Sequence, residues 1–498
     1  MNRPIRILSI GCLLLFLALL VNANYVQFVQ ADDLNDRAGN RRVLDEQFSR
    51  DRGPILVDGD PIARSVDSDD EYDYQRSYPS PYLYAHLTGF YSYTYGSSQL
   101  EHSENDILSG DDDRLFVNRV VDLVGNDQPQ GGNVTLTIDP KAQKVAQEGL
   151  ANLDRFGPGF KGSVVALDPN TGAVLAMVNR PSYNPNDIAT HDLDASQKAY
   201  EKLLKDKSRP MDNRAATETV PPGSTFKLVT AAAALDSLDL KSGSTVYGGD
   251  TYDVNGYSMP NVSEGSCSGG DETTLRIALM NSCNTSFGWL AVKMGEDALE
   301  KQAEKFGFGQ DYLSGLTTQD SRFTVEGAPS MTDNEDLLAK SGIGQQDIAA
   351  TPLQMAMVTA GVANDGEVME PYVVDEVRSP DFDTLDKADP HPIDDQPAMS
   401  EGDAKELQGM LVDTATEGTA VGVAEIPGVE VGAKTGTAQR GEGQSPYSWF
   451  VEFAPADDPK VAVAVMVDPP LDYGSPGTVT GGGYAGPIAN QVAKAVIE

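Results

Sequence analysis

Histidine and cysteine are scarce in this chain of 498 residues, which has four histidines and three cysteines. None of them falls in a Cys/His spacing that is typical of a metal site. We therefore expect neither a metal nor another cofactor.

Basic residues are also few. The chain has 37 lysines and arginines against 75 aspartates and glutamates, which gives a formal net charge of −38. Nucleic acid is excluded as a partner, because phosphate binding requires clustered Lys and Arg. A solvated surface suited to a salty or variable exterior is the simplest interpretation of this charge.

Long apolar runs are limited to one, Ile7–Val21, which follows Arg3 and Arg6. Its length is slightly short of the roughly 20 residues that span a bilayer. Val21-Asn22-Ala23 resembles a signal-peptidase site, so cleavage is an alternative to an uncleaved anchor. The positive-inside rule favours the anchor, with the remainder of the chain outside the membrane in either case.

Three short motifs follow one another along the chain: Ser224-Thr225-Phe226-Lys227, Ser282-Cys283-Asn284 and Lys434-Thr435-Gly436. In this order they fit the Ser-Lys variant of nucleophilic catalysis, in which a neutral lysine replaces histidine. Each motif alone is weak, because S-x-N also occurs at Ser103 and Ser182, and K-S-G begins at Lys241. The local context has to select among them.

The context of Ser224 predicts a helix N-terminus. Pro221-Pro222-Gly223 precedes it, and the Ala-rich run that follows Lys227 is a strong helix former. Lys227 would then lie one turn along on the same face, with its amine within reach of the serine hydroxyl. The alternative is a capping serine with a lysine that extends to solvent.

The other two motifs have contexts of their own. Ser282-Cys283-Asn284 lies between two helical patterns, where capping would be the alternative role. Lys434-Thr435-Gly436-Thr437 lies in a strand-like run over 429–439, followed by strand patterns over 448–453 and 461–467. Gly436 would let a substrate backbone approach the strand closely. Lys241-Ser242-Gly243 lacks such strands and is discarded.

As a set, these motifs resemble the penicillin-binding, serine acyl-transferase superfamily, and the resemblance runs from about residue 131 to the end. Gly162–Met177 looks like the first hairpin of a transpeptidase domain. Ser341-Gly342-Ile343-Gly344-Gln345 is similar to a segment on the helical side of the active site. The fold implied is α+β, a five-stranded antiparallel sheet flanked by helices, with the active site between the sheet and a helical subdomain.

Two N-terminal motifs refine the resemblance to class B. Arg52-Gly53-Pro54-Ile55 resembles the R-G-x-I motif of class B penicillin-binding proteins. Gly96–Glu101 resembles their anchor motif, with Gln99 where a glycine is usual. The size and lead-in are most similar to the short penicillin-binding protein A type.

Three parts of the chain are expected: 1–31, a cytoplasmic tail and transmembrane signal anchor; 32–130, a smaller dimerisation or pedestal domain; and 131–498, the transpeptidase domain. Within them, Ser65–Tyr74 and Asp111–Asp113 are predicted to be exposed loops, and Ser379–Met399 an insertion.

The resemblance implies a role for each motif residue. A stem peptide ending in D-alanyl-D-alanine would place its carboxylate near Lys434, Thr435 and Thr437. Lys227 would take the proton of Ser224, and the backbone N–H groups of Ser224 and Thr437 would form the oxyanion hole. Ser282 would relay a proton to the leaving D-alanine, Asn284 would hold the substrate amide, and Gly436 would lie beside the substrate.

Cys12 lies in the apolar run, which leaves Cys267 and Cys283 as an even pair in an oxidising compartment. We predict a disulfide between them that closes the loop leading to Ser282. Two unrelated buried thiols are the alternative.

The predicted function is a peptidoglycan D,D-transpeptidase at the plasma membrane, with its catalytic domain outside, serving division or elongation. β-Lactams would acylate Ser224. A D,D-carboxypeptidase would use the same residues with water as acceptor, and a β-lactam sensor or scaffold is the non-enzymatic alternative. A serine β-lactamase is disfavoured, since no glutamate for deacylation is recognisable. The resemblance also suggests a SEDS-type lipid II polymerase as a partner.

Overall fold

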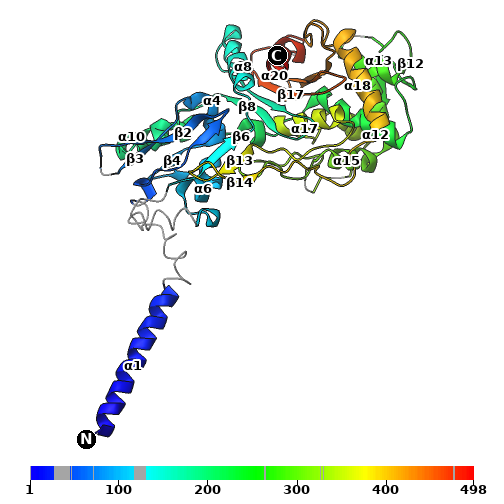
Figure 1. Ribbon diagram of the computed structural model, residues 1–498. Coiled ribbons are helices and arrows are strands. Elements are labelled where there is room, and N and C mark those ends of the chain that lie inside the picture. The colour runs from blue at the N-terminus through cyan, green and yellow to red at the C-terminus, as the bar shows by residue number, and fades with distance from the viewer. Residues whose placement is uncertain are drawn as a thin grey trace.

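The computed structural model describes residues 2–26, 45, 47–70, 72–116, 130–262, 265–325, 327–328, 330–474 and 477–498. Two large β-sheets organise the chain after the N-terminal helix (Figure 1). That helix, α1 (Asn2–Asn24), contains an apolar stretch, Ile5–Asn24, with a mean hydropathy of 2.3.

The first sheet has five strands, and every neighbouring pair is antiparallel. Its order is β15 (Gly432–Ala438), β16 (Tyr447–Ala454), β17 (Val461–Asp468), β7 (Lys161–Leu167) and β8 (Val174–Arg180). β17 is buried along its whole length. Because successive side chains of a strand point to opposite faces, its side chains pack alternately into two hydrophobic cores, one on each face of the sheet. The predicted α+β fold with a five-stranded antiparallel sheet is therefore confirmed.

Helices cover both faces of this sheet. α8 (Pro140–Ala151) and α20 (Gly486–Ile497) share one core with it, and α17 (Pro352–Ala363) lies in the core on the other face. The Ala-rich run forms α12 (Lys227–Ser237), which is buried from Lys227 to Leu235. The remaining helices of the helical side are α13 (Leu275–Met280), α14 (Asn284–Met294), α15 (Glu296–Lys305), α16 (Glu335–Ser341) and α18 (Glu401–Thr416).

The second sheet joins segments that lie far apart in the sequence. Its order is β14 (Thr384–Lys387), β13 (Val374–Arg378), β6 (Asn133–Leu136), β1 (Ile55–Val57), β2 (Asp60–Asp67) and β3 (Tyr74–Ser77), and only β1 and β6 are parallel. β13 and β14 thus complete a sheet that the N-terminal strands begin (Figure 1). The two parts of the chain expected to meet near residue 130 are joined by continuous strand pairing.

The prediction of a loop over Ser65–Tyr74 is wrong in part. Ser65, Val66 and Asp67 belong to β2 and pair with the first residues of β3. Ser379–Met399, predicted as an insertion, contains β14 at the edge of the sheet. The two segments as a whole are rich in aspartate, and for this reason composition favoured loops.

Shorter elements complete the chain. In the N-terminal part they are α4 (Pro81–Thr88), β4 (Tyr91–Ser92), β5 (Gly96–Ser97), α5 (Leu100–Ser103), α6 (Asn105–Ser109) and η2 (Asp113–Leu115). Further along they are η3 (Asn152–Phe156), α9 (Asn186–Ala189), α10 (Leu193–Lys205), α11 (Arg214–Thr217), η4 (Gly223–Phe226), β9 (Thr245–Tyr247), β10 (Thr251–Val254), β11 (Tyr257–Pro260), β12 (Glu272–Thr274) and α19 (Gly481–Tyr484).

A buried ion cluster joins the two N-terminal motifs. Glu101 accepts from Arg52 Nε at 2.7 Å and from Arg76 Nε at 2.6 Å, and all three side chains are buried. Tyr78 donates its hydroxyl to the same carboxylate at 3.1 Å. Burial alone would raise the pKa of Glu101, but Arg76 and Arg52 lower it below its ordinary value. The arginine of the R-G-x-I motif and the glutamate of the anchor motif are therefore one structural unit.

Gln99 stands in the anchor motif at the position where a glycine is usual, and its backbone keeps the conformation of a glycine. Gln99 has a φ of +52° and a ψ of −137°, a conformation that favours glycine. Its side-chain oxygen accepts from the backbone N–H of Thr317 at 3.0 Å. This hydrogen bond links the N-terminal part to the helical side and offsets some of the backbone strain.

Glu452 is a buried carboxyl group in β16, between Ala433 and Val463 on the neighbouring strands. Neither of its oxygens has a hydrogen-bond partner in the described part of the chain, and burial raises its pKa well above the ordinary value.

This raised pKa makes the stability of the protein depend on pH. Below the pKa that Glu452 has in the unfolded chain, the carboxyl group is protonated in both states and the free energy of unfolding is not reduced. As the pH rises from there towards the pKa of Glu452 in the folded protein, stability is lost. We predict that Glu452→Met raises stability by about 1–3 kcal/mol near pH 8, and by less near pH 5. Thermal unfolding at both pH values checks this; a variant less stable than the parent at pH 8 would contradict it.

Candidate active site

Residues of all three sequence motifs line one cleft beside β15, the edge strand of the five-stranded sheet. The cleft has a volume of about 500 Å³. It is lined by Ser224, Asn261, Val262, Ser266, Cys267, Asn281, Ser282, Cys283, Thr419, Thr435, Thr437, Thr480, Gly481 and Gly482. Every one of these side chains is formally uncharged, in a chain of net charge −38.

Ser224 lies in the 3-10 turn η4, which runs directly into α12 at Lys227. The predicted helix N-terminus is therefore a tighter turn followed by the α-helix. Gly223 has a φ of +55°, and a Cβ atom there would lie 2.9 Å from the carbonyl oxygen of Thr437. Trp449 in β16 also donates its indole N–H to Pro221 O at 3.0 Å. The turn that contains Ser224 is thus held against the sheet.

Gly436 is packed closely against other parts of the protein, and its expected place beside the substrate stays a prediction. A Cβ atom at this position would lie 2.9 Å from Thr225 Cγ2 and 2.9 Å from Trp449 Cβ. The space beside Gly436 is thus occupied by the turn that contains Ser224 and by the adjacent strand β16. Glycine is needed here because η4 packs directly on β15.

The buried amine of Lys227 is bound by the S-C-N turn. It donates to the backbone oxygen of Ser282 at 2.7 Å and to Asn284 Oδ1 at 2.9 Å, and lies 3.3 Å from Ser282 Oγ. Burial and the nearby Lys434 lower the pKa of Lys227 well below its ordinary value. A neutral amine has two N–H donors and one lone pair. The two oxygen acceptors satisfy the donors, which leaves the lone pair for a proton.

Ser282 connects the two buried lysines. Its hydroxyl accepts from Lys434 Nζ at 2.8 Å, and Lys434 also donates to Thr435 O at 2.9 Å. Burial lowers the pKa of Lys434 to about 7. With Lys434 as donor to its oxygen, the Ser282 O–H is available to the lone pair of Lys227. The arrangement can pass a proton between the two amines through one hydroxyl.

Ser224 itself makes no hydrogen bond to Lys227 in the described chain, contrary to the simplest expectation from their spacing. The amine instead contacts the S-C-N turn. The backbone oxygen of Ser282 is the partner that sequence reasoning missed, because a main-chain atom leaves no signal in residue identity.

The S-C-N turn has a constrained backbone. Ser282 has a φ of +58°, which costs a non-glycine residue on the order of 1–3 kcal/mol. A disulfide joins the next residue, Cys283, to Cys267, and Asn284 begins α14. The disulfide thus connects the segment between β11 and β12 to the turn that holds both lysines.

Further residues at the cleft carry no motif signal. Thr419, in the segment after α18, shares a hydrogen bond of 2.8 Å with Thr435, hydroxyl to hydroxyl. Gly481 lies so close to β16 that a Cβ atom would be 2.3 Å from Trp449 O. These residues form the wall beside the K-T-G strand, and only the glycine run over 481–483 could have hinted at them.

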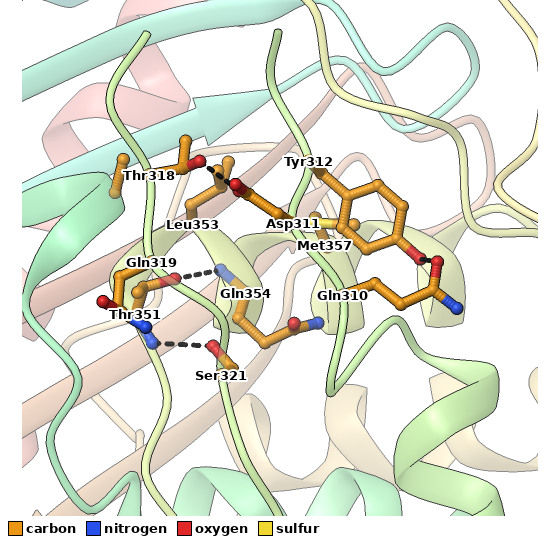
Figure 2. Close-up of a pocket in the computed structure, with 11 residues that line it drawn as sticks. Gln310, Asp311, Tyr312, Thr318, Gln319, Ser321, Thr351, Leu353, Gln354 and Met357 are labelled. Atoms are coloured by element: carbon orange, nitrogen blue, oxygen red, sulfur yellow. Dashed lines mark hydrogen bonds between the residues drawn. The ribbon is translucent and has the colours of Figure 1, made fainter.

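Another depression lies on the helical side, at the N-terminal end of α17 (Figure 2). Its lining includes Gln310–Tyr312 and Gln354, and Asp311 accepts a hydrogen bond from Thr318. The volume is about 10 Å³, room for about one water molecule. This depression is too small for a peptide and holds none of the predicted site residues.

Comparison with known proteins bears on the whole chain. A family model described as the penicillin binding protein transpeptidase domain matches residues 162–497, and one described as the penicillin binding protein A dimerisation domain matches residues 52–134. The peptidoglycan D,D-transpeptidase PbpA of Mycolicibacterium smegmatis is 40% identical over 508 residues, with 100% of this chain and 99% of the relative covered. PbpA of Mycobacterium tuberculosis is 38% identical over 509 residues, with the same coverage.

Solved structures agree with these relatives. Penicillin-binding protein A of M. tuberculosis, as its ceftriaxone acyl-enzyme complex, superposes with a TM-score of 0.84 at 36% identity, covering 91% of this chain and 100% of that chain. Its penicillin G acyl-enzyme complex gives a TM-score of 0.82 at 36% identity, covering 90% of this chain and 100% of that chain.

Proposed function

The chain belongs to the penicillin-binding protein transpeptidase family, as a class B member of the penicillin-binding protein A type, and is a serine-type peptidoglycan D,D-transpeptidase that β-lactams acylate; we propose that Ser224 is its nucleophile and Lys227 its base. The observation that carries these roles is the pair of buried amines on either side of the Ser282 hydroxyl.

In the proposed acylation, a donor stem peptide lies along β15 with its terminal carboxylate near Lys434, Thr435 and Thr437. Lys227, neutral, takes the Ser224 proton, and Ser224 Oγ attacks the penultimate carbonyl carbon. The developing oxyanion is bound by the backbone N–H groups of Ser224 and Thr437. As the C–N bond breaks, the proton returns from Lys227 through Ser282 to the amine of the departing D-alanine.

Asn284 has a supporting role in this scheme. Its Oδ1 already accepts from Lys227 at 2.9 Å and one amide N–H donates to Pro260 O at 3.4 Å, which leaves the second amide N–H to donate to the substrate. The second half of the reaction is aminolysis by a neighbouring stem. Water has to be kept from the ester until then.

Membrane attachment is proposed from α1. Its apolar stretch of 20 residues, Ile5–Asn24, has Arg3 before it and Arg6 at its start, so we place the N-terminus in the cytoplasm and the catalytic domain outside. The disulfide is compatible with an oxidising exterior. Residues 1–31, 32–130 and 131–498 are proposed as the anchor, the dimerisation or pedestal domain and the transpeptidase domain. A SEDS-type lipid II polymerase is the proposed partner, contacting the first two.

A transpeptidase and a carboxypeptidase differ in the molecule that takes the acyl group from the enzyme: an amine in the first, water in the second. The full-length protein in detergent would be incubated with an N-acyl-D-alanyl thioester donor and a primary amine, and the amide and acid products measured together. The proposal expects amide as the main product. Acid as the sole product would favour the carboxypeptidase. If neither amide nor acid forms, the β-lactam sensor or scaffold is favoured.

The pH dependence of acylation follows from the two lysines. The free enzyme needs neutral Lys227 and charged Lys434, so the second-order rate constant for penicillin acylation is expected to fall above about pH 7 as Lys434 loses its proton. At the acid end of the profile, the rate constant is expected to fall because Lys227 gains a proton and can no longer act as a base. In Lys434→Arg, which stays charged, we expect a lower rate but no alkaline limb below pH 9. An unchanged alkaline limb in this variant would contradict the assignment.

A further inference from the structure

The region around α10 is positively charged, in a chain whose formal net charge is −38. Between residues 198 and 209, five basic residues stand against two acidic ones, which gives this stretch a formal charge of +3. No other stretch of the same length in the sequence is as positive. We call Lys198–Arg209 the basic segment, and its basic residues, all of them exposed, are Lys198, Lys202, Lys205, Lys207 and Arg209.

The inner face of α10 packs on the protein, and the outer face carries lysines. On the inner face, Tyr200 stacks on Tyr95 with the ring centroids 3.9 Å apart. Lys198, Lys202 and Lys205 are spaced by four and three residues, so they share the outer face of the helix and span about 10 Å along it. The three side chains therefore form a row that points to solvent.

Acidic side chains compensate this row only weakly. In the described part of the chain, Lys198, Lys202 and Lys207 form no ion pair. Lys205 pairs with Glu201 at 3.1 Å, but both side chains are exposed, and exposed pairs of this kind are weak. The basic segment thus keeps most of its positive charge for a partner.

The basic segment lies outside the catalytic cleft. Figure 1 shows α10 beside β3, at the end of the molecule opposite α12 and α18. None of its residues lines the cleft. A ligand bound there would leave the cleft open to a second part of the same ligand.

An anionic polymer fits this surface better than a lipid bilayer does. A helix that lies in a membrane surface buries a continuous apolar face in the lipid. The apolar side of α10 is turned to the protein, and its exposed leucines, Leu193 and Leu204, stand near opposite ends of the helix. The charge of the outer face is therefore what a partner would contact.

Peptidoglycan is such a polymer, because each stem that ends in D-alanyl-D-alanine presents a carboxylate. A strand with many stems can place several carboxylates along a row of lysines, which strengthens binding through multiple contacts. The other surfaces of a chain with this net charge repel the strand at close range, within about 8 Å at physiological salt. The basic segment is where a strand can approach favourably.

We propose that the basic segment binds carboxylate-bearing peptidoglycan strands outside the catalytic cleft, with Lys198, Lys202 and Lys205 as its main contacts. The proposal rests on the proposed function for the identity of the polymer. A strand held at α10 keeps its other stems at a raised local concentration around the enzyme.

Cosedimentation with purified peptidoglycan sacculi, freed of phosphate-bearing polymers, tests the proposal. The full-length protein in detergent is first acylated with penicillin, so that the cleft is occupied. The test variant is Lys198→Glu/Lys202→Glu/Lys205→Glu. The matched control is Lys144→Glu/Lys293→Glu/Lys301→Glu, which changes the net charge equally at exposed lysines of α8, α14 and α15. A second batch of sacculi has its carboxylates converted to neutral amides.

We expect the affinity of the test variant for untreated sacculi to fall at least about tenfold, and that of the control by less than about twofold. The parent should lose its binding to amidated sacculi. An equal loss in both variants, or full binding of the parent to amidated sacculi, would overturn the proposal. Phosphatidylglycerol added to the micelles should not displace the parent from sacculi; displacement would assign the surface to lipid headgroups and overturn it as well.

Penicillin acylation of the three proteins checks the proposed function separately. Its rate should agree within about twofold among them, because none of the substituted lysines lies in the cleft. A parent that binds sacculi through α10 but is not acylated would refute the proposed function and leave the binding surface in place.

Discussion

Lys227→Met is expected to lower the second-order rate constant for penicillin acylation by about 10³-fold. General-base catalysis contributes typically about 10²–10⁴-fold, and within the described chain Lys227 is the amine positioned between Ser282 and Asn284. Burial and Lys434 depress its pKa, which gives it the neutral form that a base requires. Methionine retains the volume and removes the lone pair. Stopped-flow acylation at pH 7 measures the effect.

Lys293→Met is the matched control for this prediction, because Lys293 is an exposed lysine on α14. It should acylate within about twofold of the parent. Thermal unfolding of both variants separates lost chemistry from lost structure. Acylation of Lys227→Met within tenfold of the parent, in a protein that unfolds normally, would contradict the role of Lys227 as base.

The second large effect is expected on stability. Glu101→Ala should cost about 3–5 kcal/mol, because it leaves Arg52 and Arg76 buried without their carboxylate. Arg52 also stacks on Tyr91 with its guanidinium carbon 4.2 Å from the ring centroid, so it cannot simply turn to solvent. Urea unfolding of the full-length protein in detergent, followed by tryptophan fluorescence, measures the loss.

Glu148→Ala is the control for Glu101→Ala. Glu148 lies on the surface of α8 and pairs only loosely with Lys144 at 4.0 Å, with both side chains more than 60% exposed. Its loss should cost no more than about 0.5 kcal/mol. Equal effects of the two substitutions would show that the buried cluster does not hold the N-terminal part together.

Local patterns made much of the catalytic fold predictable. The Ala-rich run after Lys227 forms α12, and the three apolar runs after residue 429 form β15, β16 and β17, because each pattern reports burial of its own segment. The parallel pairing of β1 with β6 and the contribution of β13 and β14 were not predictable. They depend on contacts between segments that carry no shared local signal.

In the active site, too, some features were predictable from the sequence and others were not. Residue types and order located Ser224, Ser282 and Thr435 in one cleft, since the chemistry restricts side chains. Backbone contacts had no such signal. The carbonyl of Ser282 that binds Lys227, and the packing of η4 on Gly436, follow from main-chain positions that only the folded chain defines.

The central claim is that Ser224 forms the acyl-enzyme. Its most direct test is intact-mass and peptide mass spectrometry of the full-length protein after penicillin treatment, beside Ser224→Ala. The account predicts one penicilloyl group per parent chain, stable for many minutes and located on the peptide that contains Ser224, and none on the variant. An adduct that persists in Ser224→Ala, or one located on another residue of the parent, would contradict it.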